Sequence, residues 1–185
     1  MRRLILQVQT TADGYMSGPN GEMDWLTFPW TDDISTYITD LTQSVGCIVL
    51  GRKLAEGFIP HWASRPAGES QEAVDWMNDT PKVVISDSLA ESPWENAVVA
   101  GGDLVETIAK LKAQPGGDMI VYGGGTLVSS LIAADLIDDL HLFVNPTAIG
   151  SGMPVFPGGA YQRLRLVDAR PFECGIAMLH FEPKR

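Results

Sequence analysis

The chain has 185 residues, of which 45% are hydrophobic and 19% charged, and its formal net charge is −10. Such a length suits one domain that buries about 70% of the surface exposed by its unfolded form. The acidic balance argues against a nucleic-acid surface or an anionic membrane surface, because both need clustered Lys and Arg. An anionic ligand must therefore be bound by a local cluster of cations or by backbone N–H groups.

The apolar pattern predicts strands and helices in alternation along the chain. Strands are expected at 4–10, 47–50, 83–86, 97–100, 119–122, 139–147, 163–169 and 174–182. Helices are expected at 34–41, 51–57, 71–78, 104–112 and 126–134, with loops at 60–68 and 149–160. This alternation is typical of an α/β protein with a largely parallel sheet. The last two strands, joined at Arg170-Pro171, follow each other too closely for a helical crossover, so an antiparallel pair is expected there.

The cysteines, the histidines and the hydropathy pattern indicate neither a metal site nor a membrane span. Cys47 and Cys174 lie in apolar stretches and are expected to be free, buried thiols. No Cys or His spacing is typical of a metal site, so no metal is expected. No apolar run approaches the ~20 residues of a membrane span, and Gln7 and Gln9 interrupt the first run as in a strand. We expect a single cytoplasmic domain spanning 1–185.

The segment VYGGGTLVSSLI, residues 121–132, is a strand, a glycine turn and a helix. A helix N-terminus offers unpaired N–H groups and a positive dipole end, and glycine lets a phosphate approach closely. The segment is no Rossmann fingerprint, because Val128 stands at the third glycine position, and no Gly-Lys-Ser/Thr of a P-loop follows. A phosphate site and a purely structural turn both explain this pattern.

Two other strand ends carry polar residues. Arg52 and Lys53 open the helix-like GRKLAEG after the strand CIVL, and Ser86-Asp87-Ser88 follows the strand VVI. Ligands of α/β sheets gather at the carboxyl ends of strands. Solvated surface charges and ordinary turn residues are the alternatives.

The order of GRK, SDS and GGGT at successive strand ends resembles the dihydrofolate reductase superfamily, and more closely the reductase domain of riboflavin-biosynthesis deaminase-reductases. The resemblance covers nearly the whole chain and is strongest in VYGGGTLVSSLIAADLIDDLHLFVNPTAIGSGMPVF. TTADGYMSG resembles the family's first strand and Asp-Gly turn. The resemblance implies a three-layer α/β/α fold with a mixed, mostly parallel sheet, no attached deaminase domain, and a homodimer.

The same resemblance implies NADPH as cofactor. The pyrophosphate would be held by Gly123, Gly124, Gly125 and Thr126. The adenosine 2′-phosphate would be surrounded by Arg52, Lys53 and Ser86, and Gly51 would also bind the cofactor. Residues from Gln9 to Gly18 would line the nicotinamide.

A reductase also needs a proton donor near the hydride acceptor. Of the carboxylates that follow the first strand, Asp13 is the predicted site-lining acid. Gln9, Thr11, Trp25 and Trp62 are predicted to contact the substrate. Together with Phe28 and Trp30, the two tryptophans either stack on a flat heterocycle or cover an edge of the core.

Two segments depart from the family pattern. Leu54 stands where Thr is usual, and FIPHWASRPAGES, in which Arg65 is the only arginine, lacks the family's Asp-Asp-Pro and Arg segment for a ribose phosphate. The leading hypothesis is an NADPH-dependent reductase of an aminopyrimidine or pterin-like substrate, of the riboflavin-biosynthesis type. Alternatives are a dihydrofolate or pterin reductase, a non-catalytic NADP-binding module and a structural dimer.

Overall fold

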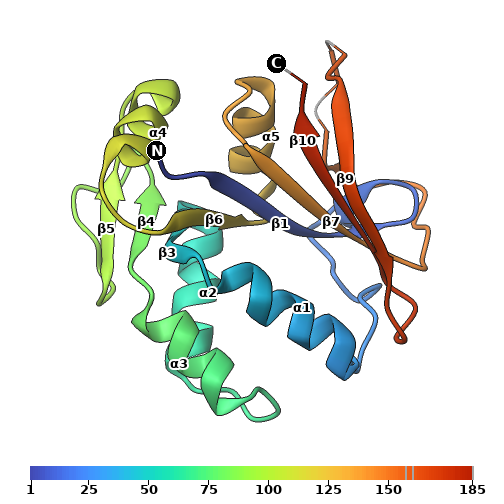
Figure 1. Ribbon diagram of the computed structural model, residues 1–185. Coiled ribbons are helices and arrows are strands. Elements are labelled where there is room, and N and C mark those ends of the chain that lie inside the picture. Colours follow the sequence, from blue (N-terminus) through green and yellow to red (C-terminus); the bar gives the residue numbers. More distant parts are fainter. Residues whose placement is uncertain (157, 160, 185) are drawn as a thin grey trace.

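A computed structural model describes residues 1–156, 158–159 and 161–184 of the chain. Its main sheet contains β1 (Leu4–Thr11), β3 (Val45–Gly51), β4 (Lys82–Ile85), β5 (Ala97–Ala100), β6 (Asp118–Tyr122), β7 (Asp139–Asn145), β9 (Leu164–Pro171) and β10 (Ala177–Pro183). The strand order is β5-β4-β3-β6-β1-β7-β10-β9 (Figure 1). Strands β5 to β7 of this order are parallel, while β10 runs antiparallel to both β7 and β9.

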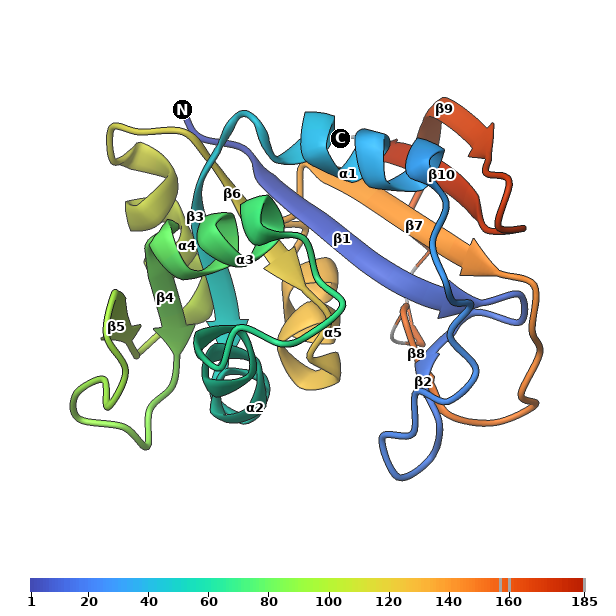
Figure 2. The same ribbon diagram turned by 90° about the horizontal axis from the view of Figure 1, so that it is seen from below.

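Helices cover both faces of this sheet, which confirms the expected three-layer α/β/α fold (Figure 2). One face packs against α1 (Asp32–Thr42), α2 (Arg52–Ala63) and α3 (Gln71–Asp79), and the other against α4 (Leu104–Ala113) and α5 (Gly125–Ala133). In the described part of the chain, no helix is long and apolar enough to cross a membrane.

The alternation along β1 decides what each face of the sheet presents, because successive side chains of a strand point to opposite sides. Leu4, Leu6 and Val8 join the core cluster under α4 and α5. Ile5 joins the cluster under α2, so Gln7 and Gln9 lie on the α1–α2 face with it. The polar positions of β1 are therefore turned toward one layer of helices.

Helix α2 is longer than expected. The sequence predicts an end at Gly57 and a loop at 60–68, but the helix continues through Pro60 to Ala63. Its apolar side explains the difference, since Ala55 and Ile59 are buried in the core below it. A proline removes one helical hydrogen bond, and this burial offsets the loss.

Two short features also differ from expectation. Within the expected loop 149–160, β8 (Met153–Pro154) pairs with β2 (Tyr15–Ser17), while residues 157 and 160 of that loop lie outside the described residues. The final turn lies at residues 172–175 and not at Arg170-Pro171, because Pro171 remains in β9, an edge strand that tolerates proline. Cys174 lies in this turn and is half-buried, and Cys47 is buried; both are free thiols.

Candidate functional site

The site begins with two helices that lack side-chain caps. Helices α2 and α5 have Gly51 and Gly124 as N-caps, and neither receives a capping hydrogen bond from a side chain. By contrast, the side chains of Ser70 and Asp103 cap α3 and α4, while the N-cap of α1, Thr31, makes no such bond. The first N–H groups of a helix have no partner within the helix. The glycine caps therefore leave these donors of α2 and α5 available to a ligand.

These two helix N-termini lie side by side. They follow β3 and β6, which are neighbours in the sheet, and both start at its carboxyl edge (Figure 2). A Cβ built on Gly124 would lie 3.6 Å from Cβ of Leu54 in α2, and one on Gly51 would lie 3.4 Å from Cβ of Leu127 in α5. Two positive dipole ends at one edge favour a bound anion.

The three glycines of the turn have different roles. Gly123 and Gly124 have φ values of 40° and 80°, a region that favours glycine, and no heavy atom lies within 4 Å of a Cβ position on Gly123. At Gly125 a Cβ would overlap the sulfur of Met153, so this glycine makes room for a side chain of β8. The first two glycines fit a phosphate cradle, whereas Gly125 is explained by packing.

The predicted 2′-phosphate residues lie at the same edge, but two of them have partners. Nη1 of Arg52 lies 2.6 Å from Oε1 of Glu56, one turn further along α2, in a half-exposed ion pair. The hydroxyl of Ser86 accepts the N–H groups of Ser88 and Leu89 at 3.2 and 3.3 Å, which closes the turn after β4. Lys53 is exposed on the first turn of α2. A role for these residues toward a cofactor stays a prediction.

Asp13 is held by three donors. Its carboxylate accepts the Thr11 hydroxyl at 2.6 Å and the N–H groups of Ile149 and Gly150 at 3.1 and 2.7 Å. The Thr11 hydroxyl, followed by the Gly150 N–H, lowers the pKa of the Asp13 carboxyl below its ordinary value. An ionised carboxylate that fastens two loops is poorly prepared to donate a proton. Catalysis by Asp13 stays a prediction, and the structure adds a competing anchoring role.

The predicted aromatic contacts lie on different elements. Trp25 is buried, with 7% of its surface exposed, and its Nε1 donates to the carbonyl of Glu22 within the same loop. Trp62 lies on α2 and not in a loop, with its ring 6.1 Å from that of Phe58.

Other aromatic pairs extend along the α1–α2 face. The rings of Phe58 and Tyr122 stack with centroids 5.7 Å apart, and those of Phe28 and Trp30 stack at 5.6 Å. Periodicity alone missed Tyr122, because it ends a buried strand and gives no motif of its own.

A polar network links β1 to the long loop before α1. The amide of Asn145 donates to Oε1 of Gln9 at 2.9 Å, and its oxygen accepts the N–H of Thr27. Asn145 is fully buried at the end of β7. The loop and the orientation of Gln9 are therefore fixed by one side chain that sequence reasoning did not single out.

Strand pairing also unites two histidines that are distant in sequence. Asp139, His141 and His180 place one possible metal-ligand atom each within 4.8 Å of one another, although the sequence predicts no metal site. Asp139 already binds Arg3 and His180, at 2.6 and 2.9 Å, and Nδ1 of His141 lies 2.9 Å from the Tyr37 hydroxyl. The two rings stack at 4.0 Å with an interplanar angle of 16°, so their in-plane lone pairs do not converge. We interpret the cluster as a buried polar network.

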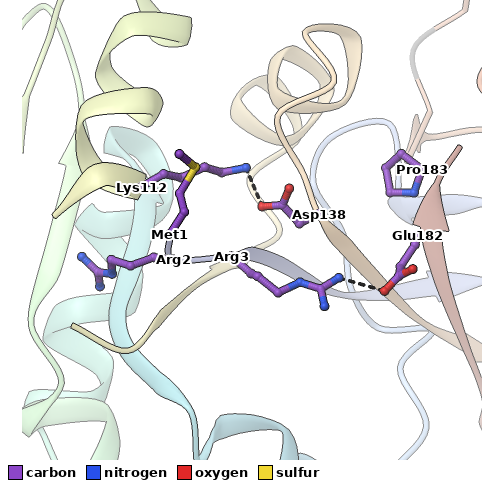
Figure 3. Close-up of a pocket in the computed structure, with 7 residues that line it drawn as sticks. All are labelled: Met1, Arg2, Arg3, Lys112, Asp138, Glu182 and Pro183. Atoms are coloured by element: carbon purple, nitrogen blue, oxygen red, sulfur yellow. Dashed lines mark hydrogen bonds and ion pairs between the residues drawn. The ribbon is translucent and has the colours of Figure 1, made fainter. Parts of the chain in front are cut away.

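A separate cavity of about 320 Å³ lies at the amino-terminal edge of the strands (Figure 3). Four of its charged side chains form pairs, with Lys112 bound to Asp138 and Arg3 to Glu182, and Arg2 donates to the carbonyl of Gly117. It is on the opposite edge from the glycine turn, because β1 begins at Leu4 beside it and ends at Thr11. The cavity therefore does not belong to the candidate site.

The fold and the arrangement of its strand ends are those of a dihydrofolate reductase-like α/β domain. More particularly, the chain belongs to the RibD C-terminal domain family, whose model matches residues 2–178.

A curated relative, the uncharacterized protein YyaP of Bacillus subtilis, is 30% identical over 96% of this chain and 93% of its own length. Among solved structures, a protein described as belonging to riboflavin biosynthesis in Shewanella sp. PV-4 is 24% identical, with a TM-score of 0.78 and full coverage of both chains.

Two further structures share the fold at lower identity. The deaminase and 5-amino-6-(5-phosphoribosylamino)uracil reductase of Thermotoga maritima is 16% identical, with a TM-score of 0.71 over 99% of this chain and 57% of that chain. Dihydrofolate reductase of Enterococcus faecalis, complexed with NADP(H), is 17% identical, with a TM-score of 0.65 over 99% of this chain and 97% of that chain.

Proposed function

We propose that this protein is an NADPH-dependent reductase that delivers a hydride to a C=N or C=O group of a small aminopyrimidine or pterin-like heterocycle. The observation that carries the proposal is the pair of helix N-termini, α2 and α5, which lie side by side and have glycine caps. The reductase activity in the name of the Thermotoga relative and the NADP(H) bound to the Enterococcus enzyme support it.

Different residues at this edge would bind different parts of the dinucleotide. The turn at Gly123 and Gly124 and the first N–H groups of α5, including that of Thr126, would hold the pyrophosphate. Arg52 and Lys53 would meet the 2′-phosphate with charge-assisted hydrogen bonds. The nicotinamide would supply the hydride, and Gln9 and its neighbours at the end of β1 would line it.

The proton for the reduced group must come from a donor near the end of β1. Asp13 is the carboxylate at that place, and it would take this role only after releasing the N–H groups of Ile149 and Gly150. Gln9 and Thr11 precede it on the same face of the strand and would line the reacting rings.

The test is titration of NADPH and NADH against wild type and the double variant Arg52→Ala/Lys53→Ala. We expect the double variant to lose NADPH affinity by on the order of a hundredfold, because each charge-assisted contact contributes roughly tenfold, and to bind NADH nearly as before. Lys110→Ala is a matched control, since Lys110 also pairs with an acid one helical turn away, Glu106 on α4. Equal losses for both cofactors would contradict the assignment of these cations.

Turnover is tested separately by NADPH oxidation with pterins, dihydrofolate and the riboflavin-pathway aminopyrimidine. Oxidation that depends on one of these compounds is expected. Tight NADPH binding without oxidation by any of them would favour a non-catalytic NADP-binding module.

A further inference from the structure

Four buried polar atoms have no hydrogen-bond partner among the described residues. They are Oε1 of Gln7, Nε2 of Gln9, Nε1 of Trp30 and the hydroxyl of Tyr122. Gln7 is only 8% exposed, so its side chain lies inside the molecule. Proteins pair the large majority of such atoms, so a group of unpaired ones needs an explanation, and a bound polar ligand or water is one.

These atoms belong to one face of the sheet. Gln7 is the register partner of Tyr122 on β6, and Gln9 follows two residues later on the same side of β1. The register partner of Gln9 on β7 is Phe143, and Trp30 packs against the cluster that contains Phe143. The side chains of Gln7, Gln9 and Tyr122 therefore point toward the α1–α2 layer, Trp30 packs beside α1, and Tyr122 comes directly before the glycine turn.

The hydrogen bonds already formed, and the chemistry of each side chain, determine which of these four atoms donate and which accept. Because Oε1 of Gln9 already accepts a hydrogen bond from Asn145, the amide of Gln9 presents its N–H₂ end. Trp30 also offers a donor, Gln7 offers a carbonyl acceptor, and the Tyr122 hydroxyl serves as either. Two stacked aromatic pairs, Phe58 with Tyr122 and Phe28 with Trp30, add flat apolar surface beside these groups.

Cations are scarce in the segments around this face, apart from Arg52 and Lys53 at the start of α2. Residues 4–51, which form β1, β2, the long loop, α1 and β3, contain no Lys or Arg. They contain the acidic residues Asp13, Glu22, Asp24, Asp32, Asp33 and Asp40. On neighbouring elements Arg65 is paired with Asp75, and Arg170 with Asp168. A substrate phosphate would meet this negative field without a free cation from these segments.

We propose that the substrate of this site is an uncharged, planar heterocycle with amide-like donors and acceptors, and that it carries no phosphate group. The inference rests on the proposed function and departs from the phosphoribosyl compound in the name of the Thermotoga relative. The edge of the ring forms hydrogen bonds with Gln7, Gln9, Trp30 and Tyr122. The negative charges of the surrounding segments disfavour a substrate that carries a phosphate.

The first experiment compares 5-amino-6-(5-phosphoribosylamino)uracil with the same compound lacking the phosphate, each with NADPH. We expect kcat/KM to be at least about tenfold higher for the compound without phosphate, since a like-charge contact costs that much or more. A tenfold preference for the phosphorylated compound would overturn the inference and leave the reductase proposal standing.

Binding of the two compounds to the protein without cofactor, measured by calorimetry, decides the inference independently of turnover. If these compounds, pterins and dihydrofolate are all left unreduced but the unphosphorylated compound binds more tightly, the reductase proposal fails and the assignment of an uncharged heterocycle to this face stands. Binding of neither compound would overturn the inference.

A pair of tyrosine variants tests the unpaired hydroxyl. Tyr122→Phe removes an oxygen without a protein partner, so the thermal midpoint should stay or rise while the Kd of the unphosphorylated compound weakens roughly three- to tenfold. Tyr37→Phe is the matched control, because its hydroxyl is 2.9 Å from Nδ1 of His141. Its midpoint should fall and its Kd should stay within about twofold. A lower midpoint with unchanged Kd in Tyr122→Phe would overturn the assignment of this residue.

Discussion

Oδ2 of Asp13 lies 2.7 Å from the backbone nitrogen of Gly150, a residue 137 positions further along the chain. This contact and the one to Ile149 fasten the turn after β1 to the loop after β7. The same two segments pair as β2 and β8 a few residues later. The carboxylate thus stabilises the small second sheet beside the glycine turn.

If anchoring is the role of Asp13, Asp13→Ala should loosen the loop at 147–156 and raise KM while kcat falls less than about tenfold. A proton donor would instead lose roughly a hundredfold or more in kcat, together with one limb of the pH–rate profile. Limited proteolysis of the loop and the pH dependence of kcat distinguish the two. Asp13→Asn keeps one acceptor oxygen and should show an intermediate protease sensitivity.

The lowered pKa of Asp13 also predicts the direction in which stability changes with pH. A carboxyl whose folded pKa is lowered stabilises the fold above its unfolded pKa and loses this contribution as pH falls through the folded value. The difference in unfolding free energy between wild type and Asp13→Asn should therefore shrink below about pH 4. A difference that stays constant down to acid pH would show that the charge plays no part.

The ion pair between Arg52 and Glu56 predicts a substitution that strengthens NADPH binding. Glu56→Gln removes a negative charge 2.6 Å from the guanidinium that is proposed to meet the 2′-phosphate. NADPH affinity should rise roughly two- to fivefold, since an exposed pair contributes about 0.2–1 kcal/mol, and NADH affinity should stay unchanged. Fluorescence titration of both cofactors checks this, and weaker NADPH binding would show that Glu56 orients Arg52 usefully.

Local patterns predicted the elements of the fold well, because apolar periodicity and glycine turns are properties of neighbouring residues. The turn VYGGGT and the helix after it lie where the pattern indicates, at β6 and α5. The predicted end of α2 at Gly57 was wrong, because burial of Ile59 outweighs the helix-ending tendencies of Gly57 and Pro60.

The interior of the candidate site depended on pairing between distant strands. Gln7 meets Tyr122 only because β1 inserts beside β6, and His141 meets His180 only because β10 returns along β7. A single sequence contains no local signal for either register. The role of Gln9 was predicted from family resemblance, but its fixed orientation required the position of Asn145.

Gly124 and Gly57 differ in backbone conformation, so their replacement by alanine should have opposite effects on stability. Gly124 has φ 80°, so Gly124→Ala should lower the unfolding free energy by about 1–2 kcal/mol and also weaken NADPH binding. Gly57→Ala is the control, because Gly57 lies inside α2 with no heavy atom within 4 Å of its Cβ position. That substitution should stabilise the fold by roughly 0.5–1 kcal/mol. Chemical denaturation and calorimetry measure both, and a strain-free Gly124→Ala with unchanged NADPH affinity would contradict the cradle.

His141 predicts a pH dependence of stability. Burial, with the nearby charges of His180 and Arg3, lowers the pKa of His141 to about 3 from its ordinary value of 6.5. Between these values the unfolded chain binds the proton and the folded protein does not, so the unfolding free energy falls as pH drops. The slope should reach roughly 1.4 kcal/mol per pH unit for this one proton. His141→Gln should flatten the slope between pH 6.5 and 5, and denaturation curves of equal slope for both proteins would exclude this residue as the cause.

The last prediction concerns assembly. The family resemblance implies a homodimer, and the strand at 141–150 with the apolar C-terminal pair could supply its shared surface. Within that region β7 is hydrogen-bonded on both sides by β1 and β10. At this end of the sheet the edge strand is β9, where Leu166 is 55% and Val167 42% exposed. An edge strand with exposed apolar residues is prone to pair with a second chain. We therefore expect a homodimer joined through β9.

Leu166→Lys should dissociate this dimer at micromolar concentration, because an edge lysine opposes strand pairing. Val98→Lys is the control, since Val98 is 61% exposed on β5, the opposite edge strand, and should leave the dimer intact. Sedimentation velocity of wild type and both variants makes the comparison. A wild-type species of 20.0 kDa would exclude the homodimer, and dissociation by Val98→Lys alone would move the interface to β5.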